Sequence, residues 1–382
     1  MKNLTYSFFL FMFLFILACQ PKEKNMDQTN STKKHLAFLG TYTKKEGHVD
    51  GHGMGVGIYT TDVDHKNWEL KNSFAEVVNP SFICHSPNHK IIYAVNEGSG
   101  GASTIKVLVY DLADYNIKEI QSVSSLGNGS CYVSTDREGK FLWAANYGSG
   151  NVIQYTINKD GTLTGGMSQQ HEGTGPNKGR QEGPHAHFIH EHPLRSEVYA
   201  VDLGADKVYR YLPTASGLQL NDSLSVTPGG GCRHLAWHPE GDHVYILNEL
   251  TGTVELWEWH GSVKERQQII SLPVEGEERY PGSAAINITA DGQYLYTSLR
   301  GPLNEVVVLK TDPKTYQMEH IQRVAVGSAP RFMDLTPDED ILTVALQDDD
   351  YILLFERDEE TGMLGDNPEK IDVASPVCVV YQ

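Results

Sequence analysis

The stretch "GGGCRHLAWHPEGDHVYILNEL", Gly229 to Leu250, has the pattern of a single β-hairpin. An apolar strand, Arg233 to Trp237, is followed by a Pro-Glu-Gly turn and a second apolar strand, His243 to Leu247. Yet an arginine, Arg233, and a glutamate, Glu249, stand at the open end of the hairpin. Charge at one end of an otherwise apolar hairpin indicates that this end faces a polar site.

The same hairpin occurs five more times along the chain. Aligned on the aromatic residue of the second strand, the copies are "FICHSPNHKIIYAVNE" (Tyr93), "YVSTDREGKFLWAANY" (Trp143), "FIHEHPLRSEVYAVDL" (Tyr199), "INITADGQYLYTSLRG" (Tyr296) and "MDLTPDEDILTVALQD", which has Thr343 in that position. Together with Tyr245 of the first hairpin, these positions are 50, 56, 46, 51 and 47 residues apart. Copies are followed by further alternating strands such as "NVIQYTI" and "TVELWEW". A period near 50 with several antiparallel strands per unit predicts the blades of a β-propeller, not a helical solenoid.

Six hairpins leave material for one more blade. The N-terminal stretch His35 to Val63 and the C-terminal stretch Ser375 to Gln382 both alternate as strands do. If the end of the chain pairs with its beginning, the ring closes and no sheet edge is exposed. We therefore predict an all-β fold, a seven-bladed propeller of four-stranded antiparallel blades, that occupies residues 35–382 as one domain.

The repeat also places two rings of residues at one mouth of the channel. Positions twelve residues before and four residues after each aromatic slot lie at the open end of each hairpin, and the inner strands of all blades converge on one axis. The first ring contains Ser81, Cys131, His187, Arg233, Ala284 and Arg331. The second ring contains Glu97, Tyr147, Leu203, Glu249, Arg300 and Gln347. Such a mixture of ionisable and polar residues is typical of a binding or catalytic pocket.

The N-terminus has the features of a targeting segment. Lys2 precedes a short apolar run that ends "ILAC", and this pattern resembles a bacterial lipoprotein signal in which Cys19 is lipidated. We expect residues 1–18 to be a signal peptide, residues 19–34 a flexible tether, and the protein to be exported and lipid-anchored in the cell envelope. An uncleaved N-terminal anchor is the alternative. The other four cysteines show no paired spacing and decide nothing.

The net charge limits the choice of ligand. A formal charge of −18 argues against nucleic acid, whose binding requires a positive surface. An anionic small molecule would have to be attracted by a local group of arginines, because the overall field repels it.

The chain contains the motifs "FLGTYT", "QEGPHAH", "DLGADKV", "CRHLAWHPEGDHVYILNEL" and "GSAPRFMDLTPD". Together these motifs resemble the lactonase family of seven-bladed propellers, which includes bacterial 6-phosphogluconolactonases and the fungal carboxy-muconate lactonizing enzyme. The resemblance extends from about His35 to Gln382. It implies a site composed of His187, Arg233, Glu249 and Arg300, all of which already belong to the two rings. It implies no cofactor and no metal.

The reaction that the resemblance implies is the opening of a lactone ring by water, or its reverse. Hydrolysis needs a base for the water and positive charge for the oxyanion. His187 and Glu249 are the candidates for base and proton shuttle, and the sequence does not rank them. We expect Arg300 to stabilise the oxyanion, and Arg233, Arg331 and His185 to contact the substrate. At a solvated mouth, His187 and Glu249 should matter more for turnover than for stability.

Two further stretches bear on the site. His185, His187, His190 and His192 lie close together, but strand alternation puts the first pair on one face and the second pair on the other, without a recognisable metal-ligand set. The Gly-rich segment from Thr164 to Gly183 leads into His185 and is either a lid that brings Lys178 and Arg180 to the substrate or a solvated surface loop.

Two other functions remain open at this point. The propeller could bind a ligand or partner at the same mouth without catalysis, or it could be a metal-dependent gluconolactonase-like enzyme. The six-bladed architecture of the latter weighs against it. An exported enzyme would also rarely meet a phosphorylated intermediate, so the lactone could be an unphosphorylated sugar lactone or one with a carboxylate. The oligomeric state cannot be inferred from the sequence.

Overall fold

The computed structural model describes Met1 and residues 34–47, 49–98, 103–274 and 282–382. The chain divides into Met1–Lys33 and one compact unit, Lys34–Gln382. The expected signal peptide and Cys19 lie outside the described residues, so the lipid anchor stays a prediction. In the described part of the chain, the regular elements are all strands, and it includes no helix long and apolar enough to cross a membrane.

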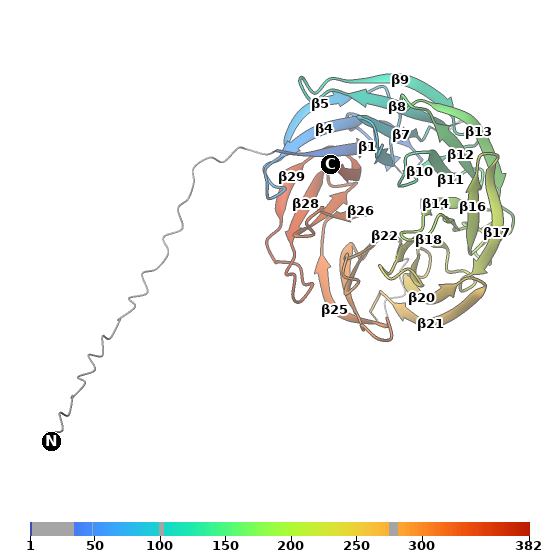
Figure 1. Ribbon diagram of the computed structural model, residues 1–382, viewed down its shortest axis with the longest axis vertical. Helices are drawn as coiled ribbons and strands as arrows, with labels where there is room; N and C mark the ends of the chain where they lie inside the picture. Colours follow the sequence, from blue (N-terminus) through green and yellow to red (C-terminus); the bar gives the residue numbers. More distant parts are fainter. Residues whose placement is uncertain (2–33, 48, 99–102, 275–281) are drawn as a thin grey trace. The chain divides into compact units, whose positions relative to one another are not determined.

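The compact unit is a ring of seven antiparallel four-stranded sheets (Figure 1). Blade 1 consists of β30 (Pro376–Tyr381), β1 (His35–Thr41), β4 (Val56–Thr61) and β5 (Glu69–Phe74). Blade 2 consists of β6 (Ile83–His85), β7 (Ile91–Asn96), β8 (Thr104–Tyr110) and β9 (Ile117–Ser124). Blade 3 consists of β10 (Ser130–Thr135), β11 (Phe141–Asn146), β12 (Asn151–Ile157) and β13 (Leu163–Gln170). Blade 4 consists of β14 (Ala186–Glu191), β15 (Val198–Asp202), β16 (Lys207–Thr214) and β17 (Gly217–Ser225).

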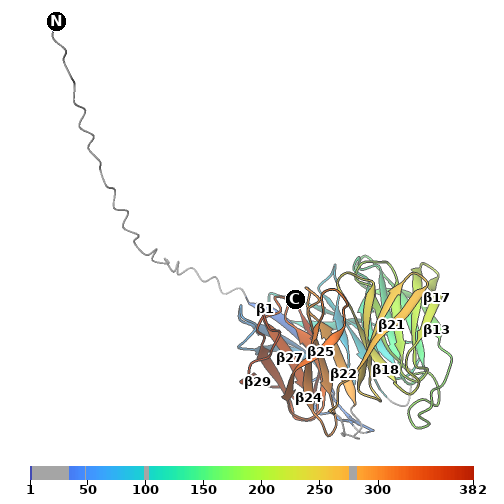
Figure 2. The same ribbon diagram turned by 90° about the horizontal axis from the view of Figure 1, so that it is seen from below.

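The remaining three blades follow the same order. Blade 5 consists of β18 (Cys232–Trp237), β19 (His243–Asn248), β20 (Thr253–His260) and β21 (Val263–Ser271). Blade 6 consists of β22 (Ser283–Ile288), β23 (Tyr294–Leu299), β24 (Glu305–Thr311) and β25 (Met318–Ala325). Blade 7 consists of β26 (Pro330–Leu335), β27 (Ile341–Leu346), β28 (Tyr351–Glu356) and β29 (Glu369–Asp372). The first strand named in each blade lies innermost, and Figure 2 shows the ring from the side.

The two ends of the propeller close the ring, and the prediction of a seventh, composite blade is confirmed. β30 pairs antiparallel with β1, with Phe38 opposite Val380, Leu39 opposite Val379 and Gly40 opposite Cys378. The C-terminal strand is thereby the innermost strand of blade 1. Its first four residues, 376–379, are buried because the strand packs between β6 of blade 2 and β26 of blade 7.

The sequence analysis did not identify a small additional hairpin between β1 and β4. It consists of β2 (Lys45–Glu46) and β3 (Val49–Asp50). The side chain of Asn79, which precedes blade 2, holds its start by accepting hydrogen bonds from the backbone N–H groups of Thr43 (2.9 Å) and Lys44 (3.0 Å).

Some of the aromatic slots that define the repeat tie neighbouring blades together, whereas Trp143 and Tyr199 hydrogen-bond within their own blades. All six slot side chains are fully buried between the sheets. The Tyr245 hydroxyl donates to the backbone carbonyl of Tyr316 in blade 6 at 2.9 Å, and the Tyr296 hydroxyl donates to that of Gly362 in blade 7 at 2.7 Å. At blade 7, Thr343 instead hydrogen-bonds the hydroxyl of Tyr381 on β30. Each slot therefore combines apolar burial with a satisfied polar group.

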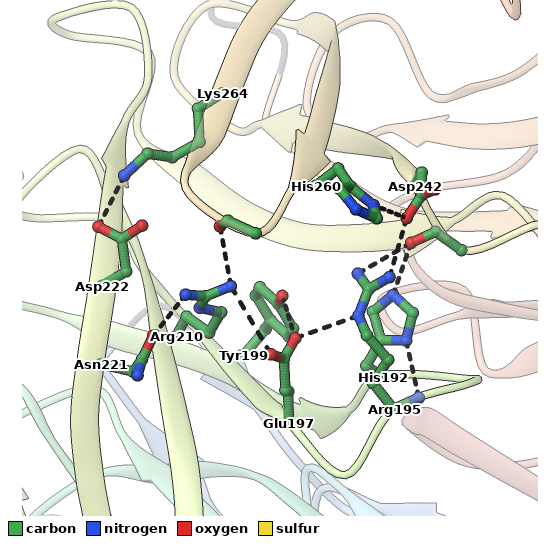
Figure 3. Close-up of polar contacts among 12 residues, drawn as sticks. His192, Arg195, Glu197, Tyr199, Arg210, Asn221, Asp222, Asp242, His260 and Lys264 are labelled. Atoms are coloured by element: carbon green, nitrogen blue, oxygen red, sulfur yellow. Dashed lines mark hydrogen bonds and ion pairs between the residues drawn. The ribbon is translucent and has the colours of Figure 1, made fainter.

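Charged side chains join blades 4 and 5 (Figure 3). Arg195 binds Asp242 at 2.9 Å, Lys264 binds Asp222 at 2.7 Å, and His192 contacts the backbone carbonyl of Gly241 at 2.7 Å. These two blades also supply three of the site residues predicted from the sequence, His187, Arg233 and Glu249. The network thus helps to fix the relative position of the two blades that carry them.

Candidate active site

A β-bulge on the inner strand aims the first-ring residues at the channel. On β14, Ala186 pairs with Asp202 and Phe188 pairs with Val201, so that His187 is left out of the ladder. The same shift leaves Arg233 unpaired on β18 and Arg331 unpaired on β26. Since a bulge breaks the alternation of side chains, two consecutive residues can face the channel.

The bulge produces two layers of side chains along the channel, and each layer lines a different cavity. The bulged residues line a cavity of about 1050 Å³ at one mouth. The residues that follow them, Phe82, Tyr132, Phe188, His234 and Phe332, line a second cavity of about 530 Å³. Phe82 stacks on Tyr132, and Tyr132 contacts both Phe188 and His234. The channel therefore has a polar mouth above an aromatic layer.

The mouth brings together most of the predicted ring. Nine of the twelve ring positions line the larger cavity, and the exceptions are Ser81, Leu203 and Ala284. Of the site residues predicted from the sequence, His187, Arg233, Glu249, Arg300 and Arg331 line it.

Three arginines surround the carboxylate of Glu249. Arg233 Nη1 lies 2.5 Å and Arg300 Nη2 lies 3.2 Å from Oε2, while Arg180 Nη2 lies 2.8 Å from Oε1. The Glu249 side chain is only 2% exposed. Burial by itself would raise its pKa, but the three guanidinium groups outweigh burial and hold the pKa of Glu249 well below its usual range. Glu249 is therefore ionised and weakly basic, and it is not the solvated rim residue expected from the sequence.

Backbone carbonyls hold the two ring arginines from the other side. Arg233 Nε donates to the carbonyl of Ala284 at 2.9 Å, and Arg300 Nε donates to that of Gly282 at 2.7 Å. Burial and the nearby charge of Arg300 lower the pKa of Arg233 to about 10. With Nε and one Nη nitrogen engaged, each guanidinium is fixed in orientation and still carries N–H groups for a ligand.

His187 lies beside this cluster in the neutral state. Its side chain is buried, and burial together with the charge of Arg233 lowers its pKa well below 6.5. Its Nδ1 atom is buried without a hydrogen-bond partner in the described part of the chain. The ring packs edge-on against Tyr147 and His234. A neutral imidazole in a cavity wall has the properties of a general base.

The opposite half of the ring supplies a second ionisable group. Tyr42 from blade 1, Glu97 from blade 2 and Arg331 from blade 7 all line the cavity. The Tyr42 hydroxyl donates to Glu97 Oε2 at 3.4 Å, and the Arg331 guanidinium lies 5.3 Å from the centre of the Tyr42 ring. Burial raises the pKa of Glu97, against the opposing effect of Arg331.

Sequence reasoning missed part of this half. Tyr42 and Glu46 lie in the N-terminal stretch, which has no counterpart in the other copies, and Asn79 precedes the first copy. The motif "FLGTYT" contains Tyr42, but nothing in the motif assigns it a role.

His185 does not line the cavity, although His187 does. It precedes β14, stacks on the Tyr147 ring with 4.5 Å between centroids, and has its Nδ1 atom 2.9 Å from the Tyr147 carbonyl oxygen. The bulge at His187 breaks the alternation that would have put both histidines on one face. His185 therefore supports Tyr147, which does line the cavity.

The segment that could form a lid is partly a strand and partly a loop. Residues from Thr164 to Gln170 belong to the outer strand β13, and only the part after it is a loop. From this loop Arg180 reaches the cavity and also donates to the Tyr147 hydroxyl at 3.2 Å, whereas Lys178 is exposed and does not line the cavity. Among the described residues, no group of three or more His, Cys, Asp or Glu side chains is placed to hold a metal ion.

Comparisons with known proteins agree with this architecture. A family model described as "Lactonase, 7-bladed beta-propeller" matches residues 36–381. The 6-phosphogluconolactonase of Bacillus subtilis is 32% identical over 360 residues, which cover 91% of this chain and 98% of that protein. A Bacteroides fragilis structure proposed to be a 6-phosphogluconolactonase superposes with a TM-score of 0.84 at 27% identity, over 93% of this chain and all of that chain. The periplasmic gluconolactonase PpgL of Pseudomonas aeruginosa superposes with a TM-score of 0.82 at 27% identity, over 91% and 99% of the two chains.

Proposed function

The chain belongs to the lactonase family of seven-bladed β-propellers, and on that premise we propose that it hydrolyses an uncharged aldonolactone of the gluconolactone type at the polar mouth of the channel. The observation that carries this proposal is the neutral His187 in the cavity wall beside arginines whose orientation is fixed. Such a pair can activate water and stabilise the oxyanion that forms when water adds to the carbonyl.

His187 is the better candidate for the base. Glu249 is ionised, but its three arginine partners leave it little affinity for a proton. The pKa of His187 is lowered by burial and by the charges of Arg233 and Arg331, so its imidazole is neutral and able to accept a proton. We therefore assign Glu249 the task of holding the arginines and His187 the task of taking the proton from water.

Arg233 is the arginine best placed for the carbonyl oxygen. It is the charged group with the largest effect on the pKa of His187. Its side chain is 5% exposed, against 16% for Arg300 and 36% for Arg180. We therefore propose Arg233, in place of Arg300, for the oxyanion, and Arg300 and Arg180 for the hydroxyl groups of the sugar.

The charges around the cavity favour an uncharged lactone. Four arginines line it, Arg180, Arg233, Arg300 and Arg331, and so do four carboxyl groups, those of Glu46, Glu97, Glu249 and Asp348. The carboxylates of Glu46, Glu249 and Asp348 offset most of the arginine charge in the cavity, and the net charge of −18 adds a repulsive field for anions. The expected export of the protein, and the gluconolactonase activity named for its Pseudomonas relative, support the same substrate.

A lactone panel tests the proposal. The purified protein is assayed with gluconolactone, with its 6-phosphate and with a carboxylate-bearing muconolactone, each with and without a chelator. We expect the largest kcat/KM for gluconolactone and no effect of the chelator. A preference for the phosphorylated lactone would assign the substrate named for the Bacillus relative instead. Activity that is lost with the chelator would favour a metal-dependent enzyme, and no turnover of any lactone would favour a binding propeller.

A further inference from the structure

Lactone hydrolysis needs an acid as well as a base. When the bond between the acyl carbon and the ring oxygen breaks, the oxygen departs as an alkoxide unless a proton reaches it. Arginines are too weakly acidic to provide this proton, and Glu249 is ionised. The proton therefore comes either from His187, after it has taken one from water, or from a separate acid that reaches the ring oxygen.

Glu97 lies on the opposite wall of the cavity. It follows the second strand of blade 2, whereas His187, Arg233 and Arg300 belong to blades 4, 5 and 6. The two walls are electrostatically connected. Arg331 influences the pKa of both Glu97 and His187, and Arg233 does the same from the other side. A ligand that fills the cavity would therefore contact Glu97 on one side and His187 on the other.

The immediate surroundings of Glu97 favour a carboxyl group that keeps its proton. Burial raises its pKa and is opposed by Arg331, Tyr42 and Arg233. The thiol of Cys131, whose pKa burial raises to about 12, is neutral and stabilises no negative charge nearby. Two carboxyl groups of one cavity thus have opposite tendencies, Glu249 toward the ionised form and Glu97 toward the protonated form. Such a division lets one carboxyl group hold the arginines as an anion while the other keeps a proton to donate.

We propose that Glu97 is the general acid that protonates the departing ring oxygen, and that Tyr42 and Arg331 are its positioning residues; this rests on the proposed function. Water adds to the acyl carbon while its proton passes to His187. The bond to the ring oxygen then breaks, and the Glu97 proton completes the new hydroxyl group. The carboxylic acid product ionises, its proton restores Glu97, and His187 loses its proton to solvent. One water is consumed, and one hydroxy-carboxylate and one proton are released.

The test compares Glu97→Gln with a matched control, Asp334→Asn. Asp334 is a partly buried carboxyl that lines the cavity below the aromatic layer, and burial raises its pKa to about 7. With gluconolactone as substrate, Glu97→Gln is expected to lower kcat by about 10² to 10⁴, with KM little changed, and to remove the alkaline limb of the pH profile of kcat. Asp334→Asn is expected to keep the wild-type kcat and profile.

Tyr42→Phe provides a readout that a structural role would not move. The Tyr42 hydroxyl stabilises the Glu97 carboxylate and lowers its pKa. Without this hydroxyl, Glu97 should hold its proton to higher pH, so the alkaline limb of kcat should shift to higher pH. The proposal is overturned if Glu97→Gln keeps the wild-type kcat, if it loses activity equally at every pH with the alkaline limb intact, or if Tyr42→Phe shifts that limb to lower pH.

An infrared measurement separates this proposal from the proposed function. In the difference spectrum of wild type minus Glu97→Gln at about pH 5.5, above the ordinary pKa of glutamate, we expect the carbonyl band of a protonated carboxyl group. This band does not depend on turnover. Its absence overturns the acid role of Glu97 even in an active enzyme. If the band is present but no lactone is hydrolysed, the proposed function fails, and Glu97 remains a protonated group at the mouth.

Discussion

At the residue scale, the repeat predicts which side chains reach the mouth but not what surrounds them. Counting from the aromatic slots finds His187, Arg233 and Glu249 because every blade places the same two positions at the same end. Counting cannot find the bulge that separates His185 from His187. It also cannot show that three arginines converge on one carboxylate, since Arg180 comes from a loop outside the repeat. The three arginines keep Glu249 ionised, and this protonation state decides that His187 and not Glu249 is the candidate base.

Glu249→Gln should destabilise the protein. It removes the negative charge that three buried or half-buried arginines share, and breaking a buried ion pair typically costs about 3–5 kcal/mol. Because the folded-state pKa of Glu249 is depressed, its contribution is present above its unfolded pKa and is lost only as the pH falls through the lower folded value. Urea unfolding should therefore show the same deficit at pH 7 and pH 5. Glu265 is exposed, and Glu265→Gln serves as the control. Equal stability of the two variants would show that the ion pairs of Glu249 with the three arginines do not stabilise the fold.

Asp334→Asn should instead stabilise the protein, in a pH-dependent way. Burial raises the folded pKa of Asp334 to about 7, while an unfolded aspartate titrates near 3.9. Between these values the unfolded chain releases the proton and the folded protein keeps it, so wild-type stability falls as the pH rises. Melting temperatures should agree at about pH 3.5, and the variant should exceed the wild type at pH 8. A difference in melting temperature between variant and wild type that is independent of pH would show that Asp334 does not titrate in this way.

At the element scale, the strands follow from alternation, whereas their irregularities do not. The glycine and polar residues from Thr164 to Gln170 predict a loop, yet they form most of the outer strand of blade 3. Outer strands bury little and so carry a weak apolar signal. The hairpin of β2 and β3 is equally hard to foresee, because its strands have two residues each and depend on the contacts of Asn79 with the backbone.

A substitution at one aromatic slot tests how much a hydrogen bond between blades contributes to stability. Tyr245→Phe removes only the hydroxyl that binds the Tyr316 carbonyl of the next blade, and it leaves that carbonyl without its donor. A buried hydrogen bond of this kind contributes about 0.5–1.5 kcal/mol, so the free energy of unfolding should fall by that amount. Tyr59 is a buried tyrosine whose hydroxyl has no hydrogen-bond partner among the described residues, and Tyr59→Phe is the matched control. Equal losses in both variants would mean that the tie between blades contributes nothing.

At the scale of the whole molecule, closure of the ring was predictable because the two leftover segments together make one blade. The structure confirms this with the pairing of β30 and β1. Deletion of Val377 to Gln382 removes three buried residues, Val377, Cys378 and Val379, from the innermost strand and opens an edge in blade 1. The truncated protein should melt at a lower temperature, and a synthetic peptide of the deleted strand should raise that temperature in proportion to its concentration. Wild-type melting without the strand would contradict the closure.

If His187 is the base for lactone hydrolysis at the polar mouth, its replacement must remove most of the turnover, so the decisive measurement is the kcat of His187→Asn on gluconolactone. The side chain of asparagine fits the space but cannot take up a proton near neutral pH. The account predicts that kcat falls by about 10² to 10⁴ at an unchanged melting temperature. It also predicts that the acid limb of wild-type kcat/KM has its midpoint below pH 6.5, because the pKa of His187 is lowered. Wild-type kcat in His187→Asn would contradict the account.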